Sequence, residues 1–160
     1  YQINKEFITD KAPLNFRWIG LIKASFPSAK IIHCSREPKD NCLSLYKNLF
    51  EGNLNFSYNE RDLGTYYNLY ADLMKFWRKS FPNGFLDVQY ESLIENQGLE
   101  IKRIINYCNL EWEEQCLHFN KNKNPIKTVS ISQARKPIYN SSIKSYQKFL
   151  PYLKELFSLV

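Results

Sequence analysis

Apolar positions recur along this chain with the two periods that separate strands from helices. Residues 31–34 form a short, mostly apolar run that closes at Ser35, which is typical of a buried strand in a parallel sheet. Pro38 then presets the backbone of a first helical turn, and Asp40 suits the positive end of the helix dipole. The pattern therefore predicts a strand followed by a helix that runs to about Phe50.

A second strand is predicted over residues 85–90, after a long helix over residues 63–81. Because a helix lies between the two strands, the connection is a crossover and the strands are expected to be parallel. One face of the helix carries apolar and aromatic residues that we expect in the core: Tyr66, Leu69, Tyr70, Leu73, Phe76 and Trp77.

Further helical periodicity predicts four more segments, over residues 16–26, 99–108, 113–119 and 143–157. The first is expected to be capped by Thr9 or Asp10 and ended by Pro27, and the last to break near Pro151. The expected fold class is α/β, a partial parallel sheet flanked by helices. Residues 52–62, polar and rich in turn formers, are expected to form a mobile loop.

Composition narrows the functional classes only a little. The 160 residues suffice for one domain with a core, and the net charge of +6 suits an anionic ligand or partner. No apolar run is long enough to span a membrane, and no signal peptide opens the chain. These features and the Lys-, Asn- and Ile-rich composition favour a bacterial cytosol, with the Golgi lumen as the expectation for a eukaryotic source.

Cysteine and histidine spacing argues against a metal centre. The four cysteines form no C-x-x-C pair and are expected to be reduced, mostly as small core residues. His33 falls within the first strand and His118 within a helical run, so a structural role is expected for both.

The residues after the first strand favour an anion site. The crevice beyond the carboxyl end of a parallel strand is where α/β sheets bind ligands, and a helix N-terminus adds a partial positive charge. Arg36 could grip a phosphate with two hydrogen bonds, and Ser44 could offer a hydroxyl from the face shared with Asp40. The alternative is that Arg36 pairs with a carboxylate and Ser44 is a solvated helix residue.

The order Arg36, Pro38, Asp40, Ser44 after an apolar strand resembles the 3′-phosphate-binding motif of PAPS-dependent sulfotransferases. In particular, the chain resembles the tyrosylprotein sulfotransferases and bacterial relatives linked to tetratricopeptide repeats. Three further stretches match in family order, residues 10–13, 88–93 and 130–137. The resemblance implies a P-loop-NTPase-like sulfotransferase fold, PAPS as sulfonate donor, adenosine 3′,5′-bisphosphate as product, and no metal.

The resemblance also assigns roles to individual residues. It implies that Arg36 and Ser44 hold the 3′-phosphate and that Tyr90, at the end of the second strand, contacts the nucleotide; the alternative is that Tyr90 packs on the core. It implies that Lys11 bridges the sulfonate with help from Ser130, and Ser132 competes with Ser130 for that place.

Other positions match the family less directly. Gln133 and Lys136 lie in a stretch that covers the nucleotide in the family. Relatives carry a basic residue where this chain has Ser145, and we expect the neighbouring Lys144 to supply that charge. A second basic position of the tyrosylprotein enzymes is Asn48 here, with Lys47 beside it.

Two parts of the family's machinery lie upstream of the matched residues. No phosphosulfate-binding loop of the G-x-x-x-x-G-K type occurs in the chain, and the family's general base also precedes the lysine. Residues 1–160 are therefore interpreted as the C-terminal portion of a single sulfotransferase domain, inactive alone, with an upstream repeat domain as a further expectation.

The leading hypothesis is a sulfotransferase that moves a sulfonate from PAPS to a hydroxyl acceptor, such as an acidic tyrosine-containing peptide or a small hydroxylated molecule. No nucleic-acid partner is expected under it. One alternative is a non-catalytic nucleotide- or RNA-binding α/β module. Another is an interaction domain that uses its aromatic helices.

Overall fold

The structure is a computed structural model that describes residues 7–50, 52, 54–121 and 141–160. Two strands, β1 (Ile32–Ser35) and β2 (Leu86–Gln89), pair in parallel, with Ile32 opposite Leu86 and Ser35 opposite Gln89. The segment between them contains the long helix α3 (Glu60–Ser80). The predicted crossover and parallel pairing are confirmed.

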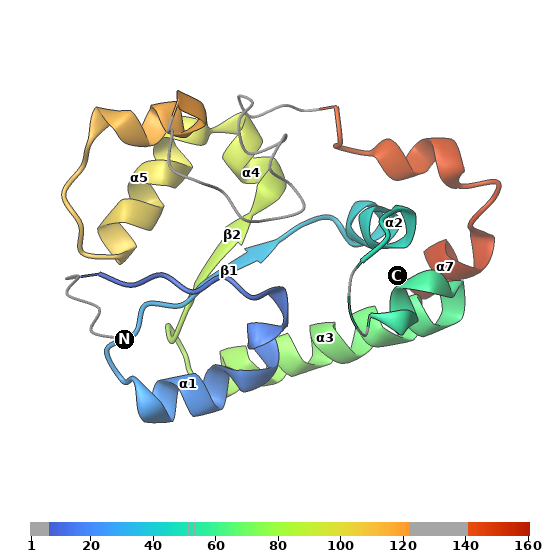
Figure 1. Ribbon diagram of the computed structural model, residues 1–160, viewed down its shortest axis with the longest axis horizontal. Coiled ribbons are helices and arrows are strands. Elements are labelled where there is room, and N and C mark those ends of the chain that lie inside the picture. The colour runs from blue at the N-terminus through green and yellow to red at the C-terminus, as the bar shows by residue number, and fades with distance from the viewer. Residues whose placement is uncertain (1–6, 51, 53, 122–140) are drawn as a thin grey trace.

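Helices flank this small sheet, as expected from the sequence (Figure 1). In that view α1 and α3 lie on one side of the strands, and α4 and α5 on the other. Their bounds, with those of the other described helices, are η1 Pro13–Trp18, α1 Ile19–Ser25, α2 Pro38–Lys47, η2 Asn55–Tyr58, α4 Tyr90–Glu95, α5 Gln97–Tyr107, η3 Glu114–Lys121, η4 Ser145–Phe149 and α7 Lys154–Leu159.

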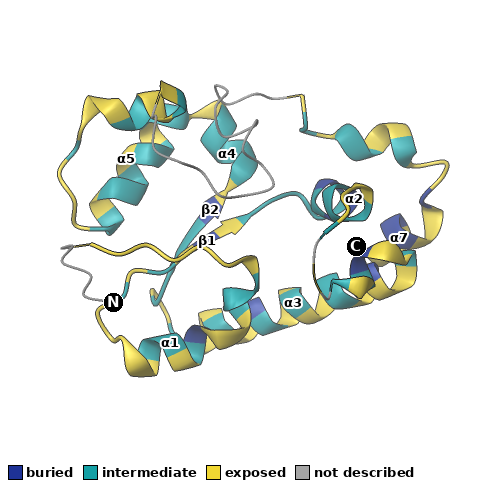
Figure 2. Ribbon diagram, viewed as in Figure 1, coloured by how far each residue is buried: buried dark blue, intermediate teal, exposed yellow. Residues whose placement is uncertain are grey.

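Burial along β1 differs from the prediction. The strand alternates: His33 is buried, whereas Ile32 and Cys34 are exposed (Figure 2). Within the described residues, α3 covers the His33 side through Tyr70, and the opposite side of β1 remains open. A strand covered on both faces was therefore the wrong expectation for this chain.

The helix after β1 ends earlier than expected and is capped by a residue that the pattern did not indicate. α2 begins at Pro38, as predicted, but ends at Lys47 rather than near Phe50. The side chain of Glu37 accepts a hydrogen bond of 2.7 Å from the Asp40 amide, so Glu37 satisfies the open helix end. Its own amide donates to Glu91 at 3.0 Å, which ties α2 to α4.

The first helical segment is split. A 3₁₀ helix, η1, precedes α1, and neither Thr9 nor Asp10 caps it; Asp10 accepts a hydrogen bond from the Asn15 side chain at 2.6 Å instead. Pro13 opens η1, a position at which its missing amide hydrogen costs nothing.

The face predicted for α3 is only partly buried. Asn59 caps the helix by accepting from the amides of Arg61 and Asp62. Leu69 and Phe76 remain more than half exposed, although both were expected in the core. Leu63, Gly64 and Met74 are the fully buried positions instead.

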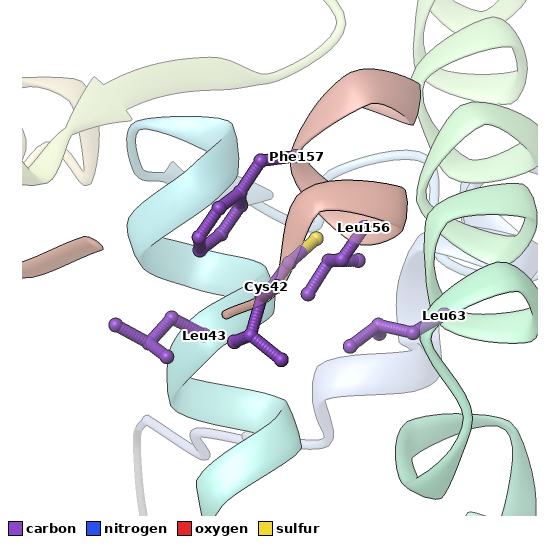
Figure 3. Packing of buried hydrophobic residues seen from close by; sticks show 6 residues of the cluster. Cys42, Leu43, Leu63, Leu156 and Phe157 are labelled. Atoms are coloured by element: carbon purple, nitrogen blue, oxygen red, sulfur yellow. The ribbon is translucent and has the colours of Figure 1, made fainter. Parts of the chain in front are cut away.

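The apolar core gathers where α2, α3 and α7 meet. The described members with the least exposure are Cys42, Leu43, Leu63, Leu153, Leu156 and Phe157 (Figure 3). The last helical segment is broken at residues 150–153, as the proline predicted, and its second half, α7, closes this core.

The four cysteines are all free, as expected, but only Cys42 is fully buried and Cys34 is exposed. Burial raises the pKa of Cys42 to about 12, so this thiol stays protonated. None of the helices described here has the length and apolarity that a membrane crossing requires.

Candidate functional site

A cavity of about 510 Å³ opens beyond the carboxyl ends of the two strands. This volume lies in the range of about 300–1,000 Å³ that is usual for small-molecule sites. The predicted residues Arg36, Ser44 and Tyr90 line it together, and Ser142 and Ser145 line it from the C-terminal segment. The expectation that Arg36, Ser44 and Tyr90 would lie near one another at this edge of the sheet is confirmed.

Arg36 is held in place by three neighbours. One terminal nitrogen donates to the backbone carbonyl of Ser142, and the same nitrogen lies 4.0 Å from an oxygen of Asp40. The guanidinium carbon lies 5.2 Å from the centroid of the Tyr90 ring, within cation–π range. These contacts fix the plane of the guanidinium.

The Nε atom of Arg36 is buried and has no hydrogen-bond partner within the described part of the chain. A buried N–H that lacks a partner costs free energy, so the position favours an acceptor supplied from outside. A phosphate or sulfate oxygen is such an acceptor, and arginine binds these groups with two hydrogen bonds.

Tyr90 links the second strand to the C-terminal segment. It is the first residue of α4, directly after β2, and its hydroxyl lies 3.0 Å from the Ser142 hydroxyl. Its ring also packs against the Arg36 guanidinium, so both the ring and the hydroxyl of Tyr90 help to position the residues that line the cavity.

The α2 side of the cavity carries polar residues one turn apart. Ser44 and Asn48 both line it, and the Asn48 side chain donates to the Ser44 carbonyl at 2.6 Å. Lys47 also lines the cavity and adds a positive charge. The two positions that the family comparison left uncertain, Lys47 and Asn48, thus face the same space as Ser44.

Asp40 is a residue of this site whose role the sequence did not reveal. It is 1 % exposed, and its carboxylate accepts hydrogen bonds from the Lys144 amide, the Ser145 hydroxyl and the Tyr146 amide at 2.6, 2.7 and 2.9 Å. This carboxylate fastens the segment that carries Ser142 and Ser145 over α2. Its partners lie more than a hundred residues away, so no local pattern could indicate them.

The remaining predicted residues lie elsewhere. Lys144 has an exposed side chain and does not line the cavity; it adopts a left-handed conformation with φ of 55°. Lys11 is exposed on the segment before η1 and is also absent from the lining. The predicted positions Ser130, Ser132, Gln133 and Lys136 lie outside the described residues.

Two tyrosines of α3 complete the wall. Tyr67 and Tyr70 line the cavity, although the pattern placed Tyr70 in the core and did not single out Tyr67. Burial, with smaller contributions from nearby acidic groups, raises the pKa of Tyr67 to about 12, and burial also raises the pKa of Tyr70. Both phenols therefore remain protonated hydrogen-bonding groups at neutral pH.

The described part of the cavity wall carries the two cationic side chains Arg36 and Lys47, the carboxylate of Asp40 and several hydroxyl groups. The described residues contain no cluster of three or more side chains that could hold a metal ion. Such a wall suits a phosphorylated or sulfated ligand with further hydroxyl groups.

Comparison with known proteins leads to the same chemistry. Residues 1–114 match the model of the Sulfotransferase family. A protein of Caenorhabditis briggsae named "Putative protein-tyrosine sulfotransferase" is 25 % identical over 114 residues, which is 71 % of this chain and 41 % of that protein. An uncharacterized protein of Aquifex aeolicus is 35 % identical over 156 residues, 96 % of this chain.

The chain spans only 41 % of the length of the Caenorhabditis relative and 20 % of the length of the Aquifex relative. The family match nevertheless covers both strands and the lining residues Arg36, Ser44 and Tyr90, whereas Ser142 and Ser145 of the cavity wall lie outside it. The chain belongs to the Sulfotransferase family.

Proposed function

We propose that this chain holds the nucleotide of the sulfonate donor PAPS, and its product adenosine 3′,5′-bisphosphate, for transfer of the sulfonate to a hydroxyl acceptor. The observation that carries the proposal is the shared cavity of Arg36 and Ser44, in which the buried Nε of Arg36 has no acceptor among the described residues. A 3′-phosphate oxygen would supply that acceptor, and the Ser44 hydroxyl would donate to the same group.

Tyr90 is proposed to position the nucleotide, because its ring backs the guanidinium and its hydroxyl meets Ser142. Sulfonyl transfer needs the acceptor oxygen in line with the sulfur and the leaving phosphate, with the developing charge held by fixed donors. Lys11 and Ser130 are proposed as those donors, and Gln133, Lys136 and Lys144 as further nucleotide contacts. These assignments rest on the family motif.

We further propose that residues 1–160 form the C-terminal portion of a larger sulfotransferase domain, whose phosphosulfate loop and general base are supplied by upstream sequence. Two features support this: a two-stranded sheet is marginal alone, and several large apolar side chains before β1 are more than half exposed. They are Phe7, Ile8, Trp18, Leu21 and Phe26. Transfer by the purified 160-residue piece would contradict this proposal.

The acceptor is proposed to be a protein tyrosine, on the strength of the name of the Caenorhabditis relative. The net charge of +6 would favour acidic residues around that tyrosine. A competition assay between an acidic tyrosine peptide and a small phenol, with full-length protein, tests this choice. Exclusive use of the small phenol would contradict it.

Thermal stabilisation of the full-length protein by adenosine 3′,5′-bisphosphate tests the central proposal. At a hundredfold excess over Kd, a ligand that binds only the folded state stabilises it by about 2.7 kcal/mol. We expect this gain for the wild type and its loss in Arg36→Ala. The exposed Arg17→Ala is the matched control and should keep it.

Adenosine 5′-monophosphate separates the 3′-phosphate from the rest of the nucleotide. If Arg36 holds the 3′-phosphate, Arg36→Ala should weaken binding of the bisphosphate and leave the weaker binding of the monophosphate unchanged. Equal losses for both nucleotides, or tight RNA binding with a steep salt dependence, would refute the assignment.

A further inference from the structure

A row of hydrogen-bonded polar side chains connects the sheet to α3 and ends at the cavity. Arg78 donates two hydrogen bonds of 2.9 Å to the Asp87 carboxylate. Asp87 lies 2.5 Å from Nδ1 of His33, and Nε2 of His33 lies 2.7 Å from the Tyr70 hydroxyl. Tyr70 lines the cavity beside Arg36, whereas His33 is buried behind it.

The positions of the hydrogens along this row of side chains follow from the ionisation of Asp87. Burial would raise the pKa of Asp87, but the hydrogen bonds from Arg78 and His33 outweigh burial and leave it lowered. An ionised carboxylate only accepts hydrogen bonds, so Nδ1 of His33 must carry a hydrogen. Neutral His33 therefore has a bare Nε2, and the Tyr70 hydroxyl must donate to it.

The Tyr70 hydroxyl has one hydrogen, and this limits what it can offer a ligand. While it donates to neutral His33, only its lone pairs are available to the cavity, and they suit a ligand hydroxyl. When His33 is protonated, Nε2 donates to Tyr70 and the phenolic hydrogen is released. The hydroxyl can then donate to an anion in the cavity.

We propose that Tyr70 contacts the ligand in this cavity and that His33 sets the direction of its hydroxyl, as an acceptor when His33 is neutral and as a donor to an anion when His33 is protonated. The proposal rests on the proposed function for the identity of the ligand. His33 acts through Tyr70 and is a positioning residue.

The surroundings of His33 make its protonation feasible. Asp87 on β2 faces one ring nitrogen, and Tyr70 of α3 faces the other. Arg78, also on α3, reaches the ring only through Asp87, and Phe85 meets it with an aromatic edge. The Asp87 carboxylate thus shields His33 from Arg78, so an imidazolium would have its counter-charge at Nδ1.

Linkage then gives a pH signature. A proton on His33 and an anion at Tyr70 stabilise each other, so anion affinity should rise as pH falls and His33 takes up a proton. Inorganic sulfate is the suitable probe, because its charge does not change over this range, whereas the phosphates of a nucleotide titrate there.

The test compares sulfate binding at about pH 5.5 and about pH 8 in full-length protein, by isothermal titration calorimetry. For the wild type we expect about fivefold tighter binding at the lower pH, the size of one ordinary hydrogen bond. Tyr70→Phe should lose most of this difference, and so should His33→Gln, which cannot titrate. Tyr152→Phe, the same change at an exposed tyrosine, should keep it.

Histidine NMR provides a second measurement on the unmodified protein. His33 and His118 are the two histidines of this chain, and His118 is exposed and serves as an internal reference. Sulfate should increase the protonated fraction of His33 at a given pH clearly more than that of His118, and Tyr70→Phe should reduce this rise. An equal rise with and without the Tyr70 hydroxyl would overturn the proposal, as would a pH-independent wild-type affinity.

The outcomes also separate this proposal from the proposed function. If Arg36→Ala abolishes binding of the bisphosphate while Tyr70→Phe leaves the pH profile of sulfate binding unchanged, the proposed role of His33 and Tyr70 is refuted and the nucleotide site stands. If sulfate binding shows the Tyr70-dependent pH profile but no adenine nucleotide binds, the role of His33 and Tyr70 stands and the nucleotide assignment falls.

Discussion

Several groups orient the guanidinium of Arg36, while its Nε has no partner among the described residues. The Ser142 carbonyl and the Tyr90 ring fix its orientation, and Asp40 at 4.0 Å balances part of its charge. A lysine could keep the charge but could not keep the planar donor fork or its stacking on the tyrosine. Orientation, more than charge alone, is what this site contributes.

Lys11 offers a test of whether binding and transfer use different residues. It does not line the cavity wall, so Lys11→Met in the full-length protein should leave stabilisation by adenosine 3′,5′-bisphosphate within error of the wild type. If Lys11 stabilises the transferring sulfonate, the same variant should slow transfer by about 10²–10³-fold. Steady-state kinetics and thermal shifts check the two parts. A variant that transfers at the wild-type rate would remove Lys11 from the mechanism.

Local pattern was sufficient to place residues whose position depends on their immediate neighbours. Arg36 and Ser44 were expected near each other because a strand end and one helix hold them at fixed separation, and the role proposed for them came from the family resemblance. Asp40 could not, since its three partners at positions 144–146 lie on a segment that no periodicity connects to it. His33 lies in the first strand, as expected, but its bond to Tyr70 spans 37 positions.

At the scale of elements, α3 connects the parts of the site. Its middle turns carry Tyr67 and Tyr70 to the cavity, and Arg78 near its end binds Asp87 of β2. Its first turns pack against α7, where Gly64 permits close approach: an added Cβ would lie 2.8 Å from Cβ of Leu159. Helix period alone could not predict this contact, because it depends on which helix returns to cover α3.

Replacement of Gly64 by alanine should therefore destabilise the protein despite the better helix propensity of alanine. Propensity favours the change by about 1 kcal/mol, whereas the clash with the Leu159 side chain costs about 1–3 kcal/mol. We expect a net loss of about 1 kcal/mol in the free energy of unfolding, measured with urea. Gly98→Ala is the control, since its nearest neighbour would lie at 4.0 Å. A Gly64→Ala variant as stable as the Gly98→Ala variant would show that α7 adjusts freely.

Asp87 joins α3 to the sheet, and its lowered pKa makes this junction sensitive to acid. Because the folded-state pKa lies below the ordinary value of 3.8, the ionised carboxylate stabilises the fold above about pH 4. That stability is lost as pH falls through the folded-state pKa. Asp87→Asn should cost about 1 kcal/mol at pH 7, because the carboxylate is partly exposed, and nearly nothing at about pH 2–3. Urea unfolding at both pH values checks this, with the exposed Asp72→Asn as control; an equal cost at both would contradict the linkage.

Several element types were predictable here and their burial was less so, whereas residues 52–62, expected as a loop, contain η2 and the first residues of α3. The crossover, the parallel pairing and the break in the last helix followed from proline, glycine and apolar spacing. The exposure of Ile32, Leu69 and Phe76 did not, because periodicity identifies an apolar face but not what covers it. Each of these side chains is apolar by sequence and uncovered in the described structure.

At the scale of the whole molecule, the two walls of the cavity come from segments that are far apart in the sequence. One wall comes from β1, α2, α3 and Tyr90, and the other from Ser142 and Ser145, near the start of η4. The apolar cluster of α2, α3 and α7 fastens the second wall to the first (Figure 3). Packing in this core and the shape of the cavity should therefore be coupled.

Leu156→Ala should reveal this coupling. The side chain is fully buried in the cluster, so its truncation should cost about 3 kcal/mol of unfolding free energy. By loosening α7, and with it the segment that Asp40 holds, it should also weaken binding of adenosine 3′,5′-bisphosphate by about tenfold under conditions where the variant is folded.

Ile19→Ala is the matched control, because Ile19 is 2 % exposed but belongs to α1, outside both this cluster and the cavity wall. It should lower stability by a similar amount and leave the affinity unchanged. Hydrogen exchange adds a local measure: the amides of Lys144 and Tyr146, which donate to Asp40, should exchange faster in Leu156→Ala and not in Ile19→Ala. Equal affinities in the two variants would mean that the second wall stays in place without help from the core, since the Asp40 hydrogen bonds also link α2 to that segment.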